Sequence, residues 1–447
     1  MLKIKPIYFI IFFGIFISIV VADINLRKFD KNEQKSHLMI KGDILLIWEE
    51  AESFKKDIAK GKNFFLSGKE YTRTYLPSKI IAAYSSATKS DLFKDFEKKI
   101  INIGDKFIFL FLQIIFYYFC LYVLYKNLIK FYANNEITNY TILFLALEPT
   151  ILQYHGTFWT ESVYFSLQLL ILSTIIKKDK TIYDFIIIGS LIGLMYYQKT
   201  VSIFLIFPIT LYFIFLKMNN KYVKISSIVF VYLIFLLFIG LNNFKRTGIF
   251  YILPIQTKEA HYIYLLPQIF EAKDNQNFQQ FRNKNENKWK IENQYNEDIF
   301  LDYYKFSNFK KDLAFREILD NKLLTLKIYS KKIFHHSLLN PIQNYYWHEY
   351  NKKKYTTEYY SSDDKKKWII WRIIYSFLIF FVVLIGLVGV FKSKNKIQFH
   401  TLLVLLIIYY ILMLGWVGNN RYFMPSMILL SFFFGNGVNF INKIFKK

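Results

Sequence analysis

The stretch KFIFLFLQIIFYYFCLYVLY, residues 106–125, decides the fold of this protein. It is almost wholly apolar and carries its only charge at its first residue, Lys106. A helix of this length crosses a hydrocarbon core about 30 Å thick, and only a helix or a closed barrel satisfies its own backbone there. The stretch therefore predicts a membrane-spanning helix.

The rest of the chain repeats this pattern. Its 447 residues are 54% hydrophobic and 20% aromatic, which is outside the usual range of soluble domains. Further apolar segments lie near residues 6–22, 138–153, 161–176, 183–197, 200–216, 224–241, 368–391, 400–416 and 422–440. The first could be a cleaved signal peptide, but its length favours a retained helix. The sequence predicts an all-α polytopic membrane protein with about ten transmembrane helices.

Basic residues orient these helices. If Lys3 and Lys5 lie in the cytoplasm, every second connection after them is also basic. The clusters are Lys126/Lys130, Lys177/Lys178/Lys180, Lys217/Lys221/Lys224, Lys392/Lys394/Lys396 and Lys443/Lys446/Lys447. Much of the formal net charge of +25 thus reports topology, and we expect no nucleic-acid partner.

Two connections on the opposite, outer side are long, at about residues 23–104 and 242–367. Loops of this length are usually functional. Apolar residues recur at helical spacing within 310–335, so we expect the two loops to form a small, mostly helical cap. The chain then divides into an N-terminal transmembrane module (1–241) that contains the first loop, an outer-face loop region (242–367) and C-terminal transmembrane helices (368–447).

The first outer loop carries three acidic residues, Asp43, Glu49 and Glu50, ahead of the turn Tyr75-Leu76-Pro77. A carboxylate held at the membrane surface can act as a general base on a hydroxyl. The alternative is a solvated acidic helix face without a catalytic role.

Two further ionisable residues stand at the outer ends of apolar segments. Glu161 opens one in Thr160-Glu161-Ser162, where it either contributes to a site or lies in a first turn that Thr160 caps. Lys199 lies between two segments on the side that is poor in lysine, which indicates a bound phosphate or an acidic partner, unless the side chain reaches out to water. Glu148 lies within a segment, and Pro149 beside it predicts a kink whose freed backbone could satisfy the carboxylate.

Cations follow later on the same side: Arg246, His261 and Arg421. The planar fork of arginine can hold two phosphate oxygens at once, although both arginines could instead be interfacial anchors. The chain has no Walker loop, no dinucleotide-binding glycines and no closely spaced His or Cys, and its single Cys120 excludes an internal disulfide. We therefore expect no cofactor and no metal, with a divalent ion as the alternative.

These pieces resemble the GT-C integral-membrane glycosyltransferases, in particular the protein O-mannosyltransferase and aminoarabinose transferase group. The resemblance rests on Gly42-Asp43 and Tyr75-Leu76-Pro77, on Thr160-Glu161-Ser162, on Gly189 through Lys199, on Asn243 through Gly248, and on Arg421 through Pro425. It covers nearly the whole chain as architecture, although the matching motifs are short.

The resemblance implies an inverting enzyme that moves a sugar from a polyprenyl-phosphate carrier to a lipid, glycan or protein acceptor. Asp43 resembles the catalytic base, and Ile44 stands where many members carry a second acid, which leaves Glu49 and Glu50 open. Lys199, Arg246, Arg421 and His261 would hold the donor phosphate, and Glu161 would shape the site. The implied location is a bacterial inner membrane with the site facing the periplasm. Alternatives are a flippase or a polymerase or ligase of lipid-linked saccharides.

Overall fold

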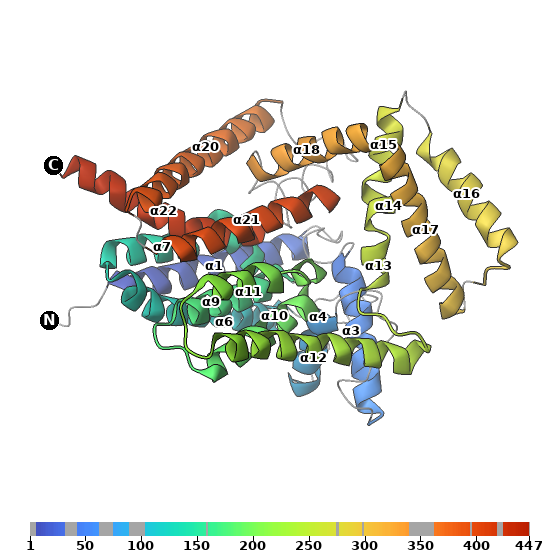
Figure 1. Ribbon diagram of the computed structural model, residues 1–447, viewed down its shortest axis with the longest axis horizontal. Coiled ribbons are helices and arrows are strands. Elements are labelled where there is room, and N and C mark those ends of the chain that lie inside the picture. The colour runs from blue at the N-terminus through green and yellow to red at the C-terminus, as the bar shows by residue number, and fades with distance from the viewer. Residues whose placement is uncertain are drawn as a thin grey trace.

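The computed structural model describes residues 6–31, 43–61, 75–88, 103–157, 160–273, 277–296, 299–338, 362–393, 396–417 and 423–446. All regular elements in these ranges are helices, most of them gathered in one bundle (Figure 1). The prediction of an all-α polytopic membrane fold is confirmed.

Each of the ten apolar segments is helical. Eight are single helices: α1 (Pro6–Lys31), α6 (Ile103–Tyr132), α9 (Glu161–Ile176), α10 (Ile182–Gln198), α12 (Lys221–Thr247), α20 (Ser362–Ser393), α21 (Ile397–Val417) and α22 (Met424–Phe445). The other two are divided, one into α7 (Asn135–Leu147) and α8 (Pro149–His155), the other into the 3-10 turn η1 (Thr200–Ser202) and α11 (Ile206–Phe215). Five of the described helices, α1, α6, α12, α20 and α22, are long and apolar enough to cross a membrane.

Proline divides the third segment, as the sequence predicts. Glu148 ends α7 and opens α8, and its carboxylate accepts hydrogen bonds from the amide of Ile151 at 2.8 Å and from the hydroxyl of Thr150. The hydroxyl of Tyr375 donates a third at 3.0 Å. The interpretation that freed backbone satisfies Glu148 is therefore confirmed, with two side chains contributing as well.

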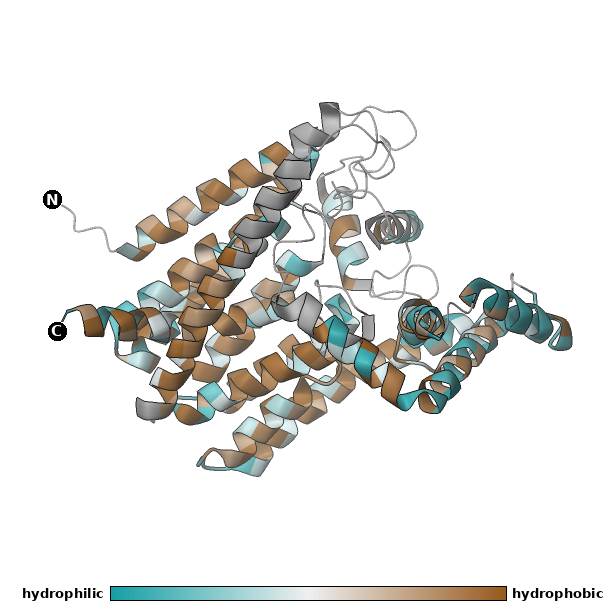
Figure 2. Cartoon of the chain, turned by 90° about the horizontal axis from the view of Figure 1, so that it is seen from above, coloured by the Kyte–Doolittle hydropathy of each residue, from teal (hydrophilic) through white to brown (hydrophobic). Residues whose placement is uncertain are grey.

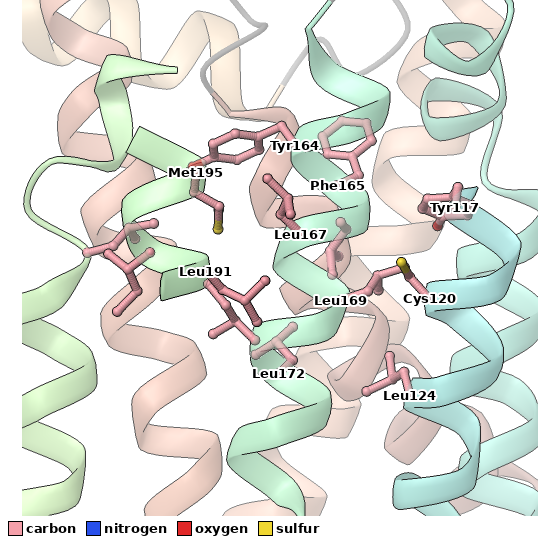
Figure 3. Packing of buried hydrophobic residues seen from close by; sticks show 14 of the residues in the cluster. Tyr117, Cys120, Leu124, Tyr164, Phe165, Leu167, Leu169, Leu172, Leu191 and Met195 are labelled. Atoms are coloured by element: carbon pink, nitrogen blue, oxygen red, sulfur yellow. The ribbon is translucent and has the colours of Figure 1, made fainter. Parts of the chain in front are cut away.

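The centre of the bundle is formed by α6, α9 and α10. Tyr117, Cys120 and Leu124 of α6 face α9 near Leu169, and on the other side of α9 Leu172 lies near Leu191 of α10 (Figure 3). These side chains are buried among themselves, which fixes the two helices whose ends carry Glu161 and Lys199. The apolar packing thus positions the polar residues at the ends of the bundle.

Helices α20 and α22 approach each other closely through glycine. A Cβ atom on Gly386 would lie 1.9 Å from the carbonyl oxygen of Phe433, and one on Gly437 would lie 2.1 Å from that of Val382. Small residues of this kind let the backbones of membrane helices come into contact.

The second long loop folds as a helical cap at one end of the bundle (Figure 1). It consists of α13 (Ile255–Lys258), α14 (Ala260–Tyr264), α15 (Leu266–Ala272), α16 (Phe278–Glu292), α17 (Phe300–Asp320) and α18 (Lys322–Leu338). The outer cap helices are markedly more polar than the bundle (Figure 2). The helical pattern predicted in 310–335 is present but divided at Asn321, and α12 continues beyond residue 241 to Thr247.

The first long loop contributes α3 (Asp43–Ala59) and α4 (Tyr75–Thr88), which pack on each other. The pair lies between the bundle and the cap, and α4 also contacts α10 (Figure 1). The turn expected at Tyr75-Leu76-Pro77 is the first turn of α4, where Pro77 lies buried and where proline is tolerated. Both long loops therefore converge on the same end of the bundle.

Candidate functional site

An ion pair joins the beginning of α9 to the end of α10. Lys199 Nζ lies 2.9 Å from Glu161 Oε1, and the two side chains are 9% and 0% exposed. A second contact runs beside it, because Gln198 Nε2 donates to the backbone oxygen of Thr160 at 2.9 Å. The acidic partner expected for Lys199 is thus Glu161, and Lys199 does not reach out to water.

The alternative interpretation of Glu161 is confirmed in its position but not in its cap: Glu161 lies in the first turn of α9 directly after the N-cap residue Thr160, which gives no capping hydrogen bond. The hydroxyl of Thr160 instead donates to Glu161 Oε2 at 3.3 Å. Each oxygen of Glu161 therefore has a donor within hydrogen-bond distance.

The first long loop brings two charged residues to the same end. Glu50 of α3 is buried and accepts a hydrogen bond from the hydroxyl of Ser78 in α4 at 2.7 Å. The next residue, Lys79, is only 2% exposed. Its Nζ lies 5.2 Å from the ring centre of Phe54 in α3 and 5.8 Å from that of Tyr197 in α10, within the range of cation–π attraction. Lys79 therefore connects the first loop to the residues that precede Lys199.

Arg246 completes this cluster from the last turn of α12. Burial and, to a smaller extent, the positive charge of Arg246 lower the pKa of Lys79, and the negative charge of Glu50 opposes them; together they bring this pKa to about 7. Residues 50, 79 and 246 thus lie close enough for their charges to act on one another. We refer to Glu50, Lys79, Glu161, Lys199 and Arg246 as the charged cluster.

Three sequence-predicted residues have side chains outside the described part of the chain. Asp43 is the first residue of α3, seven positions before Glu50, and Glu49 is in the same helix. Arg421 lies between α21 and α22. The start of α22 is held against α9, because Gln168 Nε2 donates to the backbone oxygen of Pro425 at 3.1 Å. The predicted roles of Asp43, Glu49 and Arg421 therefore stay predictions, because their side chains lie outside the described part of the chain.

His261 lies in the cap helix α14. Burial lowers its pKa, and the neighbouring charge of Lys332 in α18 lowers that pKa further. The ring is therefore neutral near pH 7 and offers a hydrogen bond but no charge to a phosphate.

Sequence reasoning missed Lys79. The available signal was its position two residues after Pro77, in a motif that the sequence had already linked to the first-loop carboxylates. In so lysine-rich a chain nothing distinguished this lysine from the others, because its burial depends on α3 and α10 as well as on α4.

The charged cluster is suited to binding an anion next to a carboxylate. Lysine and arginine hold phosphate oxygens, and in a buried place their attraction is screened less than in water. Across the described residues, no three His, Cys, Asp or Glu side chains gather as a metal site requires.

Residues 97–241 match the family described as dolichyl-phosphate-mannose-protein mannosyltransferase. The matched segment runs from before α6 into α12 and contains Glu161 and Lys199. No curated protein and no solved structure matches the chain. Over residues 97–241, about a third of the chain, the match confirms the resemblance to GT-C glycosyltransferases, and it supports a membrane glycosyltransferase that uses a lipid-linked sugar donor.

Proposed function

We propose that this protein transfers a sugar from a polyprenyl-phosphate carrier to an acceptor hydroxyl, with inversion of configuration. The premise is the membrane glycosyltransferase with a lipid-linked sugar donor that the family match supports. The observation that carries the proposal is that Lys79 lies within reach of the charges of Arg246 and Glu50 and 5.8 Å from the ring centre of Tyr197, two residues before the lysine of the Lys199–Glu161 pair. Lys79 comes from α4, Lys199 follows the end of α10, and Arg246 comes from α12, so the three cations are far apart in sequence. The reaction takes place at the outer face, and a bacterial inner membrane with a periplasmic site is the proposed location.

The donor phosphate binds to the cations of the charged cluster. Lys79 and Arg246 supply charge, and Arg246 can hold two oxygens at once. Lys199 has three N–H donors and can keep Glu161 while it contacts the phosphate. Arg421 and the neutral ring of His261 are further proposed ligands. When the bond between the anomeric carbon and the phosphate oxygen breaks, the electron pair leaves with the carrier phosphate, and fixed cations stabilise it.

The carboxylates of α3 act on the acceptor. In the proposal, Asp43 accepts the proton of the acceptor hydroxyl while its oxygen attacks the anomeric carbon from the side opposite the phosphate, which inverts the configuration. Glu50 is held by Ser78 and lies near Lys79, so we assign it the role of keeping Lys79 partly charged.

Buried amide oxygens beside the cluster support recognition of a sugar. Gln198 Oε1 and Asn243 Oδ1 are buried and have no hydrogen-bond partner within the described residues. Gln198 immediately precedes Lys199, and Asn243 lies one turn before Arg246. Unpaired buried acceptors are costly, and the hydroxyl groups of a bound sugar can satisfy them.

The competing functions share the cations but not the base. A flippase binds a lipid-linked sugar without breaking a bond, so it needs no carboxylate to accept a proton. A polymerase or ligase of lipid-linked saccharides performs a related transfer to another carrier-linked glycan. The acceptor of the proposed enzyme is a lipid, a glycan or a protein; the matched family's description specifies a protein.

The test is transfer of label from a panel of radiolabelled polyprenyl-phosphate sugars in membranes that contain the wild type, Asp43→Asn or Glu52→Gln. Glu52 lies in the same helix as Asp43 but is part-exposed, with Lys56 at 4.0 Å, so it serves as the matched control. We expect transfer with the wild type and the control and its loss with Asp43→Asn, while donor binding persists.

Each result has a clear meaning. Transfer that survives Asp43→Asn would contradict the assigned base. Donor binding without transfer to any acceptor in wild-type membranes would favour the flippase, and label recovered only on a carrier-linked glycan would favour the polymerase or ligase.

A further inference from the structure

A pocket lined by lysines lies at the end of the bundle opposite the charged cluster. It has a volume of about 480 Å³, and five lysines from three parts of the chain line it: Lys130, Lys177, Lys178, Lys180 and Lys396. Helix α9 begins at Glu161 and ends before Lys177, and its 16 residues span about 24 Å. The lysine pocket is therefore separate from the charged cluster by most of a membrane thickness.

The positive charge in the lysine pocket is only partly compensated. Lys177 pairs with Asp184 at 2.8 Å. Burial and the positive charges of Lys177 and Lys224 lower the pKa of Lys180, and Asp184 and Asp179 oppose them; together they bring this pKa to about 8. Cations are thus crowded together here.

The remaining lysines make no ion pair within the described part of the chain. Over the residues that the structure describes, no carboxylate lies within 4.0 Å of Lys130, Lys178 or Lys396. Lys396 Nζ lies 4.9 Å from the ring centre of Phe131, so this lysine is held against the wall of the pocket.

One wall of the pocket is partly apolar and is joined to α21 by a hydrogen bond. Tyr132 lies at the end of α6, and its hydroxyl is 3.0 Å from His400 Nε2 in α21. Phe131 and Ile176 add apolar surface beside the lysines. A cavity with both kinds of lining accepts a charged group that is attached to an apolar or neutral body.

We propose that the lysine pocket binds a phosphate group, carried by an anionic phospholipid of the adjoining leaflet or as a free phosphate. Its volume lies in the range of small-molecule sites, and basic pockets between transmembrane helices are suited to anionic head groups. Crowded lysines also repel one another, and an anion relieves this repulsion. The site is distinct from the proposed donor site and does not depend on the proposed function.

The experiment uses the full chain purified in a neutral detergent. Binding is measured by the shift in thermal unfolding with short-chain phosphatidylglycerol, short-chain phosphatidylcholine or inorganic phosphate, and by native mass spectrometry for retained lipid. The test variant is Lys130→Gln/Lys178→Gln/Lys396→Gln. The matched control, Lys126→Gln/Lys221→Gln/Lys443→Gln, removes the same charge from the same end of the bundle without touching the pocket lining.

We expect the wild type and the control to bind an anionic ligand and the test variant to bind it at least tenfold more weakly. Binding of phosphatidylglycerol alone identifies a lipid head group, whereas binding of inorganic phosphate with similar affinity identifies a free anion. Equal loss in the test and control variants would show general attraction by charge and overturn the proposal. So would equal binding of phosphatidylcholine, or no binding of any of the three. If the test variant does not fold, the single variant Lys178→Gln decides by the same criteria, with at least a threefold loss expected.

Discussion

Lys199 Nζ lies 2.9 Å from Glu161 Oε1, and this pair joins the first residue of α9 to the residue that ends α10. The two helices run in opposite directions through the bundle, so the pair closes their ends on the side where α3 and α4 pack. A buried pair of this kind holds two chain segments in a fixed position, and removing one partner leaves a charge without compensation.

The coupling of this pair is the first prediction. Glu161→Gln alone and Lys199→Met alone should each lower the free energy of unfolding by about 3–5 kcal/mol, because each leaves one buried charge unpaired. The double variant should lose clearly less than the sum of the two. Unfolding by SDS in mixed micelles gives the free energy of unfolding of the wild type, the two single variants and the double variant, which together form a double-mutant cycle. Additive losses would show that the pair contributes no coupling.

Arg246 is predicted to bind the donor and not the acceptor. Arg246→Ala should weaken donor binding by about 2–5 kcal/mol, as is usual when one partner of a desolvated charge contact is removed. The acceptor affinity should change little, and equilibrium binding of each substrate measures the two effects. Lys245→Ala is the matched control, because Lys245 is the exposed neighbour in the same turn of α12. A similar loss of acceptor affinity would contradict the phosphate assignment.

Lys79 should make donor binding depend on pH. The pKa of its side chain is about 7 in the free protein, and an anionic donor beside it raises that pKa, so binding takes up a proton above pH 7. Donor affinity should be constant below about pH 6 and then fall by up to tenfold per pH unit above about pH 7, until the pKa of the bound state is reached. A sugar phosphodiester is the right probe, because it does not titrate in this range.

Two variants separate Lys79 from other titrating groups. Lys79→Arg should remove the pH dependence, because the guanidinium group stays protonated. Glu50→Gln should weaken donor binding at pH 7, because the charge of Glu50 raises the pKa of Lys79 and its loss leaves less of the charged form. A pH profile that is unchanged in Lys79→Arg would assign the dependence to another group.

Helix packing gives a prediction that is independent of function. Gly386→Ala should lower the free energy of unfolding by about 1–3 kcal/mol, because the added methyl group meets the backbone of α22, which cannot move aside. Gly389→Ala, one turn later in α20, places its methyl group 3.8 Å from the nearest atom and should be neutral or stabilising. Unfolding in mixed micelles measures the free energy of unfolding of the two variants and of the wild type. Equal effects would mean that the close contact of α20 and α22 is not present in the membrane.

The sequence by itself determined the class of fold. Apolar segments of membrane-spanning length are a local property, so all ten were found as helices, and Pro149 marked the break between α7 and α8. Asn321 was not predicted as a break, because the apolar spacing continues across it from Ile318 and Leu319 to Leu323, although asparagine is a common residue at helix ends. The basic connections also predicted which ends of the helices lie together. Three of these connections contribute lysines to the lysine pocket.

The tertiary structure decided which polar residues meet. The sequence indicated Glu161 and Lys199 separately, but their pairing depends on how α9 packs against α10. Lys79 was not recognised, because its burial and its lowered pKa arise from α3, α10 and α12. Burial in a membrane follows from composition along the chain, whereas a charge is paired or left unpaired by neighbours that are tens to hundreds of residues away.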